Sequence, residues 1–241
     1  MYTFDSRVRY SETDENGKLA PLALMNYLQD CSLFQSEALG VGLQRLKEKK
    51  RAWLLSGWQI VIESYPKFAE PIRIGTIPYS FKGGLGHRNF AIWDADGNFL
   101  VKANSRWMFV DTEKGTLVRP DEEEKAAYGE ETPLEMEYAP RRMRMPEGLE
   151  AQEVIEVREH HLDTNHHVNN AQYVAMALEL LPAGETVREI RAEYHAQAHL
   201  RDQVIPYIGW EGDWFYVGLA SAPGQYYATV SLRTEITKDT H

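Results

Sequence analysis

The sequence predicts an α+β protein in which one arrangement, a strand, a helix and then four strands, occurs twice. A short pattern recurs 149 residues apart, as Val8-Arg9 with Asp14, Asn16 and Leu19, and as Val157-Arg158 with Asp163, Asn165 and Val168. Each copy runs into a helical pattern and then into segments rich in β-branched and aromatic residues. The repeat therefore predicts two related halves of one domain.

Each half is expected to contain one amphipathic helix. In the first half, the helical spacing of apolar residues starts at Pro21, which suits a first turn, and stops at Gly40. In the second half, it runs from a cap at Asn169 or Asn170 to a stop at Pro182. We expect each sheet to curve around its helix, and the two sheets to pair edge to edge, because this covers exposed strand edges.

Four strands are expected after each helix. They are 53–64, 72–81, 88–93 and 99–110 in the first half, and 187–194, 203–210, 214–220 and 226–236 in the second. Turn residues at 94–97 and 222–224 mark hairpins. The expected division is an N-terminal repeat at 1–118, a charged linker at 119–150 with a short helix at 121–128, and a C-terminal repeat at 151–241.

Composition excludes several classes of protein. The formal charge of −10 disfavours nonspecific binding to nucleic acid or to anionic membranes, because both need cationic groups. The chain has no apolar run long enough to span a membrane, and its first ten residues contain no apolar signal core, so we expect a cytoplasmic protein. The single cysteine, Cys31, excludes an internal disulfide and a cysteine-rich zinc module.

The densest group of polar side chains is the segment 160–170, HHLDTNHHVNN, just before the second helix. It combines a carboxylate, amides and imidazoles, and the free N–H groups at the start of the helix face the same region. An imidazole can transfer a proton, a carboxylate can orient it, and the N–H groups can hold an oxyanion. The segment therefore predicts a hydrolytic site for an acyl group. The alternative is a helix cap beside surface histidines.

A difference between the two copies favours the catalytic interpretation. The first copy keeps Asp14 and Asn16 but has Gly17-Lys18 where the second copy has His166-His167. We therefore expect only the second copy to perform chemistry.

Other kinds of site fit the sequence less well. Three histidine pairs, 160/161, 166/167 and 195/199, offer metal ligands, but no HExxH or CxxC motif accompanies them, so no metal is expected. Cys31 lies on the apolar stripe of the first helix, which favours packing over a nucleophilic role. The GxSxG and GxxxxGK[ST] motifs of serine hydrolases and P-loop proteins are absent.

The run 163–173, DTNHHVNNAQY, resembles the active-site segment of the acyl-ACP thioesterases of plants and bacteria, which carry D-x-N-x-H-V-N-N-x-x-Y. Segments of the first half resemble the N-terminal repeat of that family and occur in the same order: 9–19, 27–30, 52–56, 65–67, 96–97 and 106–107. The resemblance thus extends over nearly the whole chain.

This resemblance implies two tandem hot-dog units, each a curved antiparallel sheet around a central helix. It implies hydrolysis of the thioester between a fatty acyl chain and acyl carrier protein, which ends chain elongation and needs no cofactor. By position, Asp163, Asn165 and His167 are the implied catalytic set. The N-terminal unit is implied to hold the acyl chain, with Trp53 and Trp58 as candidate substrate-binding residues; an ordinary core position is the alternative for both.

One departure from the family pattern concerns the general base. Where the family usually has a glutamate, this chain has Gln197. Glutamine does not titrate, and a general base contributes about 10²- to 10⁴-fold to a rate. We expect Gln197 to orient the attacking water while Asp163 or His167 accepts its proton. His195 and His199 are the alternative bases.

The implied partner is acylated carrier protein with its phosphopantetheine arm. This partner is acidic, so an acidic enzyme needs a local cationic dock. Two clusters are candidates: Lys47, Lys49, Lys50 and Arg51, or Arg141, Arg142 and Arg144. Both a monomer and a homodimer are compatible with two units in one chain. An acyl-CoA thioesterase and a noncatalytic acyl-binding hot-dog protein are the alternative functions.

Overall fold

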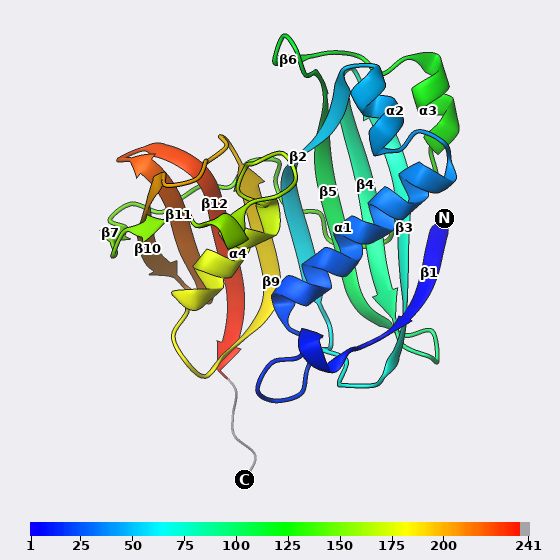
Figure 1. Cartoon of the computed structure of the whole chain (residues 1–241). Coiled ribbons are helices and arrows are strands. Elements are labelled where there is room, and N and C mark those ends of the chain that lie inside the picture. The colour runs from blue at the N-terminus through cyan, green and yellow to red at the C-terminus, as the bar shows by residue number, and fades with distance from the viewer. Residues whose placement is uncertain (237–241) are drawn as a thin grey trace. The chain divides into compact units, whose positions relative to one another are not determined.

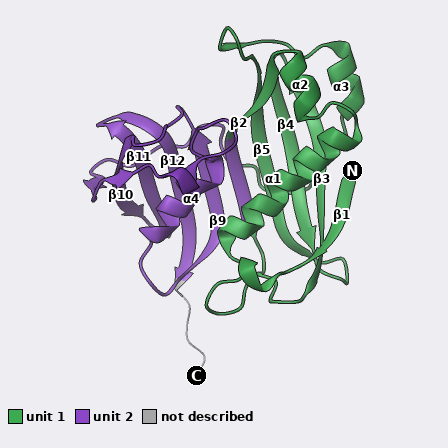
Figure 2. Cartoon of the chain, viewed as in Figure 1, with its two compact units in different colours: residues 1–56, 62–138 green, residues 57–61, 139–241 purple. Residues whose placement is uncertain are grey.

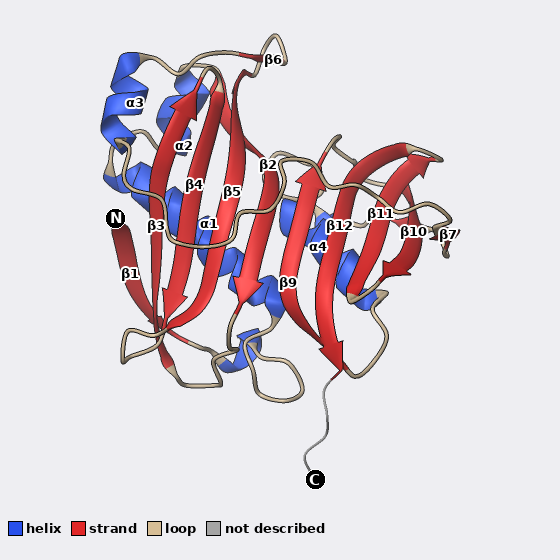
Figure 3. Ribbon diagram, turned by 180° about the vertical axis from the view of Figure 1, so that it is seen from behind, coloured by secondary structure: helices blue, strands red, loops and turns tan. Residues whose placement is uncertain are grey.

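The structure is a computed structural model that describes residues 1–236, and these residues form two compact units (Figure 2). Unit 1 comprises residues 1–56 and 62–138, and unit 2 comprises residues 57–61 and the chain from 139 onward. In each unit, the principal helix lies on one face of antiparallel strands (Figures 1 and 3). None of the helices described is long and apolar enough to cross a membrane. The division at residues 118 and 150 stays a prediction.

Unit 1 is built on strands that pair in the order β1-β3-β4-β5-β2, with β6 beside β5. Their bounds are β1 (Tyr2–Arg7), β2 (Arg51–Ile62), β3 (Pro71–Lys82), β4 (Leu85–Trp93), β5 (Phe99–Asp111) and β6 (Thr116–Leu117). The hairpin predicted between β4 and β5 is present. Asp94 Oδ1 accepts hydrogen bonds from the backbone N–H groups of Asp96 at 2.9 Å and Asn98 at 2.8 Å, and Gly97 has a φ of 85°.

Helix α1 (Pro21–Ala38) starts at the predicted proline, and Gly40 follows its last turn with a φ of 71°. Its buried side includes Leu24, Leu28 and Cys31, and it packs against β3 and β1. Burial raises the pKa of the Cys31 thiol to about 12. The thiol therefore stays protonated at neutral pH, as its packing interpretation expects.

Two shorter helices complete unit 1: α2 (Leu43–Glu48) and α3 (Glu122–Tyr128). The α3 helix was predicted from the sequence, and the side chain of Asp121 caps it by accepting a 2.7 Å hydrogen bond from the Glu124 N–H. The α2 helix was not predicted, because its six residues are too few to show an apolar period.

A guanidinium group is buried in the core of unit 1. Arg88 on β4 is only 8% exposed, and its Nη1 donates to Gln35 Oε1 on α1 and, at 3.3 Å, to Thr76 Oγ1 on β3. Its Cζ lies 5.2 Å from the centre of the Tyr128 ring. All of these partners are neutral, and burial lowers the pKa of Arg88 to about 10. The charge is thus held in place by hydrogen bonds and a ring contact.

Unit 2 repeats the plan in a shorter form. Its strands are β7 (Glu150–Ala151), β8 (Ile155–Glu156), β9 (Glu185–Tyr194), β10 (Gln203–Glu211), β11 (Trp214–Ala222) and β12 (Gln225–Ile236), paired as β9-β12-β11-β10-β7 with β8 beside β10. Residues 57–61 of β2 belong to this unit and pair antiparallel with β9. The α4 helix (Asn170–Glu179) is shorter than α1 and buries Tyr173, Val174 and Met176.

Candidate active site

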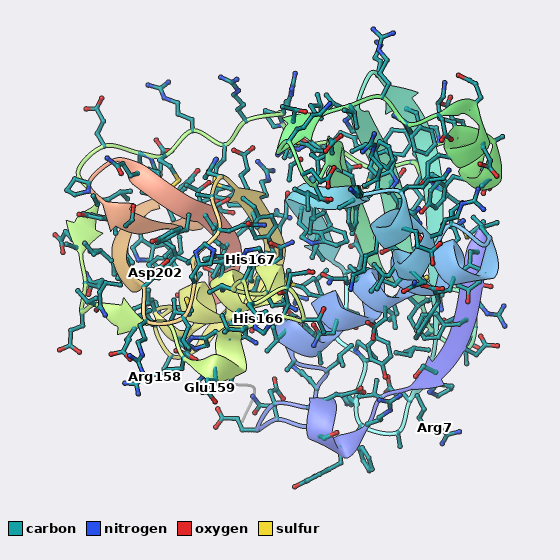
Figure 4. The ribbon with its side chains drawn as sticks, turned by 45° about the horizontal axis from the view of Figure 1, so that its top comes forward. Arg7, Arg158, Glu159, His166, His167 and Asp202 are labelled. Carbon is teal, nitrogen blue, oxygen red and sulfur yellow. The ribbon has the colours of Figure 1, made fainter. Side chains whose placement is uncertain are left out.

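The loop 163–169, directly before α4, is organised by one carboxylate. Asp163 Oδ1 accepts hydrogen bonds from the backbone N–H groups of Asn165 at 2.8 Å and His167 at 3.2 Å. The Asn165 side-chain amide donates to Asp163 Oδ2 at 3.3 Å. Asp163 and His167 are half-buried, whereas Asn165 is exposed. The structure therefore brings all three predicted residues together in a single turn. Figure 4 labels His167 and its neighbour His166 in this loop.

Two further residues of this loop, Asn169 and His166, are explained by its backbone structure. Asn169 is the helix cap, since its Oδ1 accepts a 2.9 Å hydrogen bond from the Ala171 N–H. The cap interpretation is therefore correct for Asn169, and Asn170 is the first helical residue. His166 has a φ of 60°, in the left-handed region that favours glycine.

The loop 196–202 lies beside this turn. The N–H of Val168 donates to the carbonyl of Ala198 at 3.0 Å, and the N–H of Ala198 donates to the Tyr173 hydroxyl at 3.0 Å. These bonds bring the His199 ring to 4.9 Å from the His167 ring, with an edge-to-face angle of 81°. The Gln197 side chain is exposed and, within the described part of the chain, has no hydrogen-bond partner. The ring of His199 therefore contacts the ring of His167, whereas the side chain of Gln197 makes no hydrogen bond to it.

The other histidines are engaged elsewhere. His195 Nε2 lies 3.1 Å from Thr229 Oγ1 on β12. His161 Nδ1 accepts a 3.0 Å hydrogen bond from the Arg158 N–H, and the pKa of His161 is lowered, first by burial and then by neighbouring His160. Over residues 1–236, no three His, Cys, Asp or Glu side chains are grouped to hold a metal ion.

Unit 1 contains the same turn without the imidazoles. Asp14 Oδ1 accepts from the N–H groups of Asn16 and Lys18, both at 2.9 Å, as Asp163 does from Asn165 and His167. Gly17, with a φ of 70°, takes the place of His166. Because the turn forms in both units, the carboxylate is explained by local structure, whereas the imidazole is specific to unit 2.

The second loop is duplicated as well. The Leu19 N–H donates to the carbonyl of Pro66 at 2.8 Å, so Lys67 in unit 1 stands where His199 stands in unit 2. The Lys67 N–H donates to Glu70 Oε2 at 3.0 Å, and the His199 N–H donates to Asp202 Oδ2 at 2.8 Å. Asp202 was missed in the sequence analysis. The shared spacing of Lys67 to Glu70 and of His199 to Asp202 is the signal that could have found it.

The two tryptophans predicted to bind substrate lie in different units. Trp53 belongs to unit 1, donates from Nε1 to Glu124 Oε1 at 3.0 Å, and has the rings of Phe109 and Phe81 at 4.7 and 5.8 Å. Trp58 belongs to unit 2 and is 4% exposed. These contacts fit the core alternative, and the substrate-binding role stays a prediction.

Replacing His166 by glycine is expected to raise the free energy of unfolding by about 0.5–1 kcal/mol. The left-handed conformation costs a residue with a Cβ about 1–2 kcal/mol in the folded state, and glycine avoids this cost. Glycine also has more freedom in the unfolded chain, which lowers the gain by about 0.5–1 kcal/mol. Denaturant unfolding of the wild type and His166→Gly measures the change. Turnover should be unaffected, and a large loss of turnover would place His166 in the chemistry.

Two domain profiles match this chain. The acyl-ACP thioesterase N-terminal domain matches residues 1–128, and the acyl-ACP thioesterase C-terminal domain matches residues 147–205. The chain belongs to the acyl-ACP thioesterase family. A chloroplastic palmitoyl-acyl carrier protein thioesterase of Arabidopsis thaliana is 25% identical over 203 residues, which cover 76% of this chain and 48% of that relative. The chain thus spans about half the length of this curated relative of the family.

Solved structures confirm the fold. An acyl-ACP thioesterase from Bacteroides thetaiotaomicron superposes with a TM-score of 0.88 at 21% identity, over 97% of each chain. The 12:0-ACP thioesterase from Umbellularia californica superposes with a TM-score of 0.86 at 17% identity, over 98% of this chain and 97% of that one. The predicted α+β class with two tandem hot-dog units is therefore confirmed for this member of the acyl-ACP thioesterase family.

Proposed function

We propose that the chain hydrolyses the thioester of fatty acyl-acyl carrier protein to free fatty acid and carrier protein. The observation that carries the proposal is the 163–169 loop, in which Asp163 orders a turn that displays Asn165 and His167 directly before α4. Membership of the acyl-ACP thioesterase family supports the same reaction. The predicted cytoplasmic location and the oligomeric state stay predictions.

The reaction needs a proton acceptor, a stabiliser of negative charge and a proton donor. Water adds to the thioester carbonyl, the carbonyl oxygen becomes an oxyanion, and the C–S bond then breaks as the sulfur takes a proton. Asn165 offers an amide, and the backbone N–H groups at the start of α4 offer a positive dipole end, both suited to the oxyanion. His167 offers an imidazole, whose ring nitrogens can donate or accept a proton.

The carrier protein is expected to dock on the second of the two cationic clusters. In the first cluster, Lys49 pairs with Asp121 at 3.2 Å, Lys50 with Glu113 at 2.5 Å, and Arg51 with Asp111 at 2.9 Å, so its charge is largely neutralised. Arg142 and Arg144 are exposed, and neither has an ion-pair partner within residues 1–236. Unpaired guanidinium groups are the better ligands for an acidic partner.

Reversing the charge of Arg142 and Arg144 together is expected to raise KM for acyl-ACP without changing KM for the same acyl chain on coenzyme A. Repulsion from an acidic carrier protein acts mainly on association, so the difference should shrink as salt rises. The matched control is Lys50→Glu, at a residue whose ammonium is already paired. Equal KM values for wild type and the double variant at low salt would exclude this docking surface.

The function is tested by measuring thiol release from a series of acyl-ACP and acyl-CoA thioesters of equal chain length. Turnover that favours acyl-ACP is the expected result. Preference for acyl-CoA would instead make the chain an acyl-CoA thioesterase. Retention of acyl ligand by folded protein without any turnover would make it a noncatalytic binding protein and overturn the proposal.

A further inference from the structure

We propose that His199 is the general base of the thioesterase reaction and that Asp202 is its positioning residue, an assignment that rests on the proposed function. The imidazole of His199 takes a proton from the water that attacks the thioester carbonyl. The water oxygen bonds to the carbonyl carbon, the C–S bond breaks, and the proton passes to the departing sulfur. No other reactant is required.

The first support is the position of His199. Its ring meets the ring of His167 edge to face at 4.9 Å, so the two imidazoles form one group on adjacent loops of unit 2. The His199 side chain is 59% exposed, which gives water access to it. Gln197, the residue that takes the place of a titratable base in the sequence, makes no side-chain hydrogen bond to His167 in the part of the chain described.

The second support is the carboxylate beside His199. The His199 Nδ1 lies 3.7 Å from Asp202 Oδ2, which also accepts hydrogen bonds from the His199 N–H at 2.8 Å and from the Tyr227 hydroxyl on β12 at 3.4 Å. The carboxylate is thus held on the Nδ1 side of the ring and leaves Nε2 for water. When the ring takes a proton, the carboxylate stabilises the resulting imidazolium.

The third support is the comparison of the two units. Backbone hydrogen bonds of this loop recur in unit 1, and each copy contains a left-handed residue, Ala69 with a φ of 67° and Arg201 with a φ of 69°. The loop therefore folds with either Lys67 or His199 in the same place. A lysine ammonium has no lone pair for a proton at neutral pH, whereas a neutral imidazole has one. Because the loop forms with a lysine in unit 1, folding does not explain the choice of histidine at position 199. A role as a base does explain it.

The test is thiol release from acyl-ACP by His199→Gln, with Lys67→Gln as the matched control in unit 1. We expect kcat to fall about 10²- to 10⁴-fold in His199→Gln with little change in KM, because a base acts on the transition state. Lys67→Gln should keep wild-type kcat. Added imidazole should restore part of the activity of His199→Ala, since a free base can enter the vacated space, and a merely structural role would give no such rescue.

Asp202→Asn provides the second arm. Asparagine keeps an acceptor for the His199 N–H and so preserves the loop, but it removes the charge that stabilises the imidazolium. We expect a smaller fall in kcat than in His199→Gln, whereas Glu70→Gln, the matched change in unit 1, should have no effect. His167, Asp202 and Tyr227, the other titratable groups near the ring, remain present in His199→Gln. Loss of the acid limb of the pH profile in that variant would therefore be assigned to His199.

The outcomes separate the two claims. An active wild type with full activity in His199→Gln would overturn the assignment of the base and leave the proposed function intact. A wild type that releases no thiol from any acyl-ACP would overturn the proposed function, and the assignment with it.

Discussion

Replacing His167 by alanine is expected to lower kcat/KM for acyl-ACP hydrolysis by about 10²- to 10³-fold. The imidazole either exchanges a proton or holds the developing oxyanion, and losing one such group costs a rate factor of about this size. Its backbone N–H, which supports the turn through Asp163, is retained in the variant. Thiol release under steady-state conditions measures the effect, and circular dichroism checks that the protein is folded.

The duplicated turn supplies the control for this prediction. Lys18 holds the same backbone position in unit 1, and its N–H makes the same hydrogen bond to Asp14. Lys18→Ala should therefore keep wild-type kcat/KM, while Asn165→Ala should lower it together with His167→Ala. Wild-type activity in His167→Ala would contradict the site, whatever the substrate.

Replacing Gln35 by leucine is expected to lower the free energy of unfolding by about 1.5–3 kcal/mol, the usual worth of a hydrogen bond to a charged group. Gln35 Oε1 is an acceptor for the buried Arg88 guanidinium, and leucine leaves that charge with Thr76 and the Tyr128 ring alone. Urea unfolding followed by fluorescence measures the change.

Removing the charge at the same time should restore stability. Arg88→Met has a side chain of similar length and no charge, but on its own it leaves the buried Gln35 Oε1 without its donor and should be destabilising. The double variant Gln35→Leu/Arg88→Met removes both partners and should be more stable than either single variant. Additive destabilisation in the double variant would show that packing, not an unpaired charge, accounts for the effect.

The proposed chemistry lies where one copy of a duplicated structure departs from the other. Asp14 and Asp163 order the same turn, and Glu70 and Asp202 accept the same backbone hydrogen bond. These acidic residues therefore have a structural role in both units. The imidazoles of unit 2 replace lysines of unit 1, and this exchange changes proton affinity without changing the loops.

The sequence by itself determined the parts of the molecule that depend on neighbours along the chain. The start of α1 at Pro21, the short helix at 121–128 and the hairpin after Asp94 all follow from local hydrogen bonds and apolar spacing. The pattern of strands followed for the same reason. The α2 helix was missed because six residues are too short for a period.

Only the tertiary structure decided which distant groups meet. It placed His199 and Asp202 beside His167, paired Lys49 with Asp121, and buried Arg88 against Gln35. In the sequence, these partners are 32 or more residues apart, except that His199 and Asp202 are separated by three positions. Contacts of that kind depend on strand register and on loop packing, which one sequence does not specify. The sequence therefore left several residues as candidates for the base. The tertiary structure shows that one of them, His199, lies beside His167.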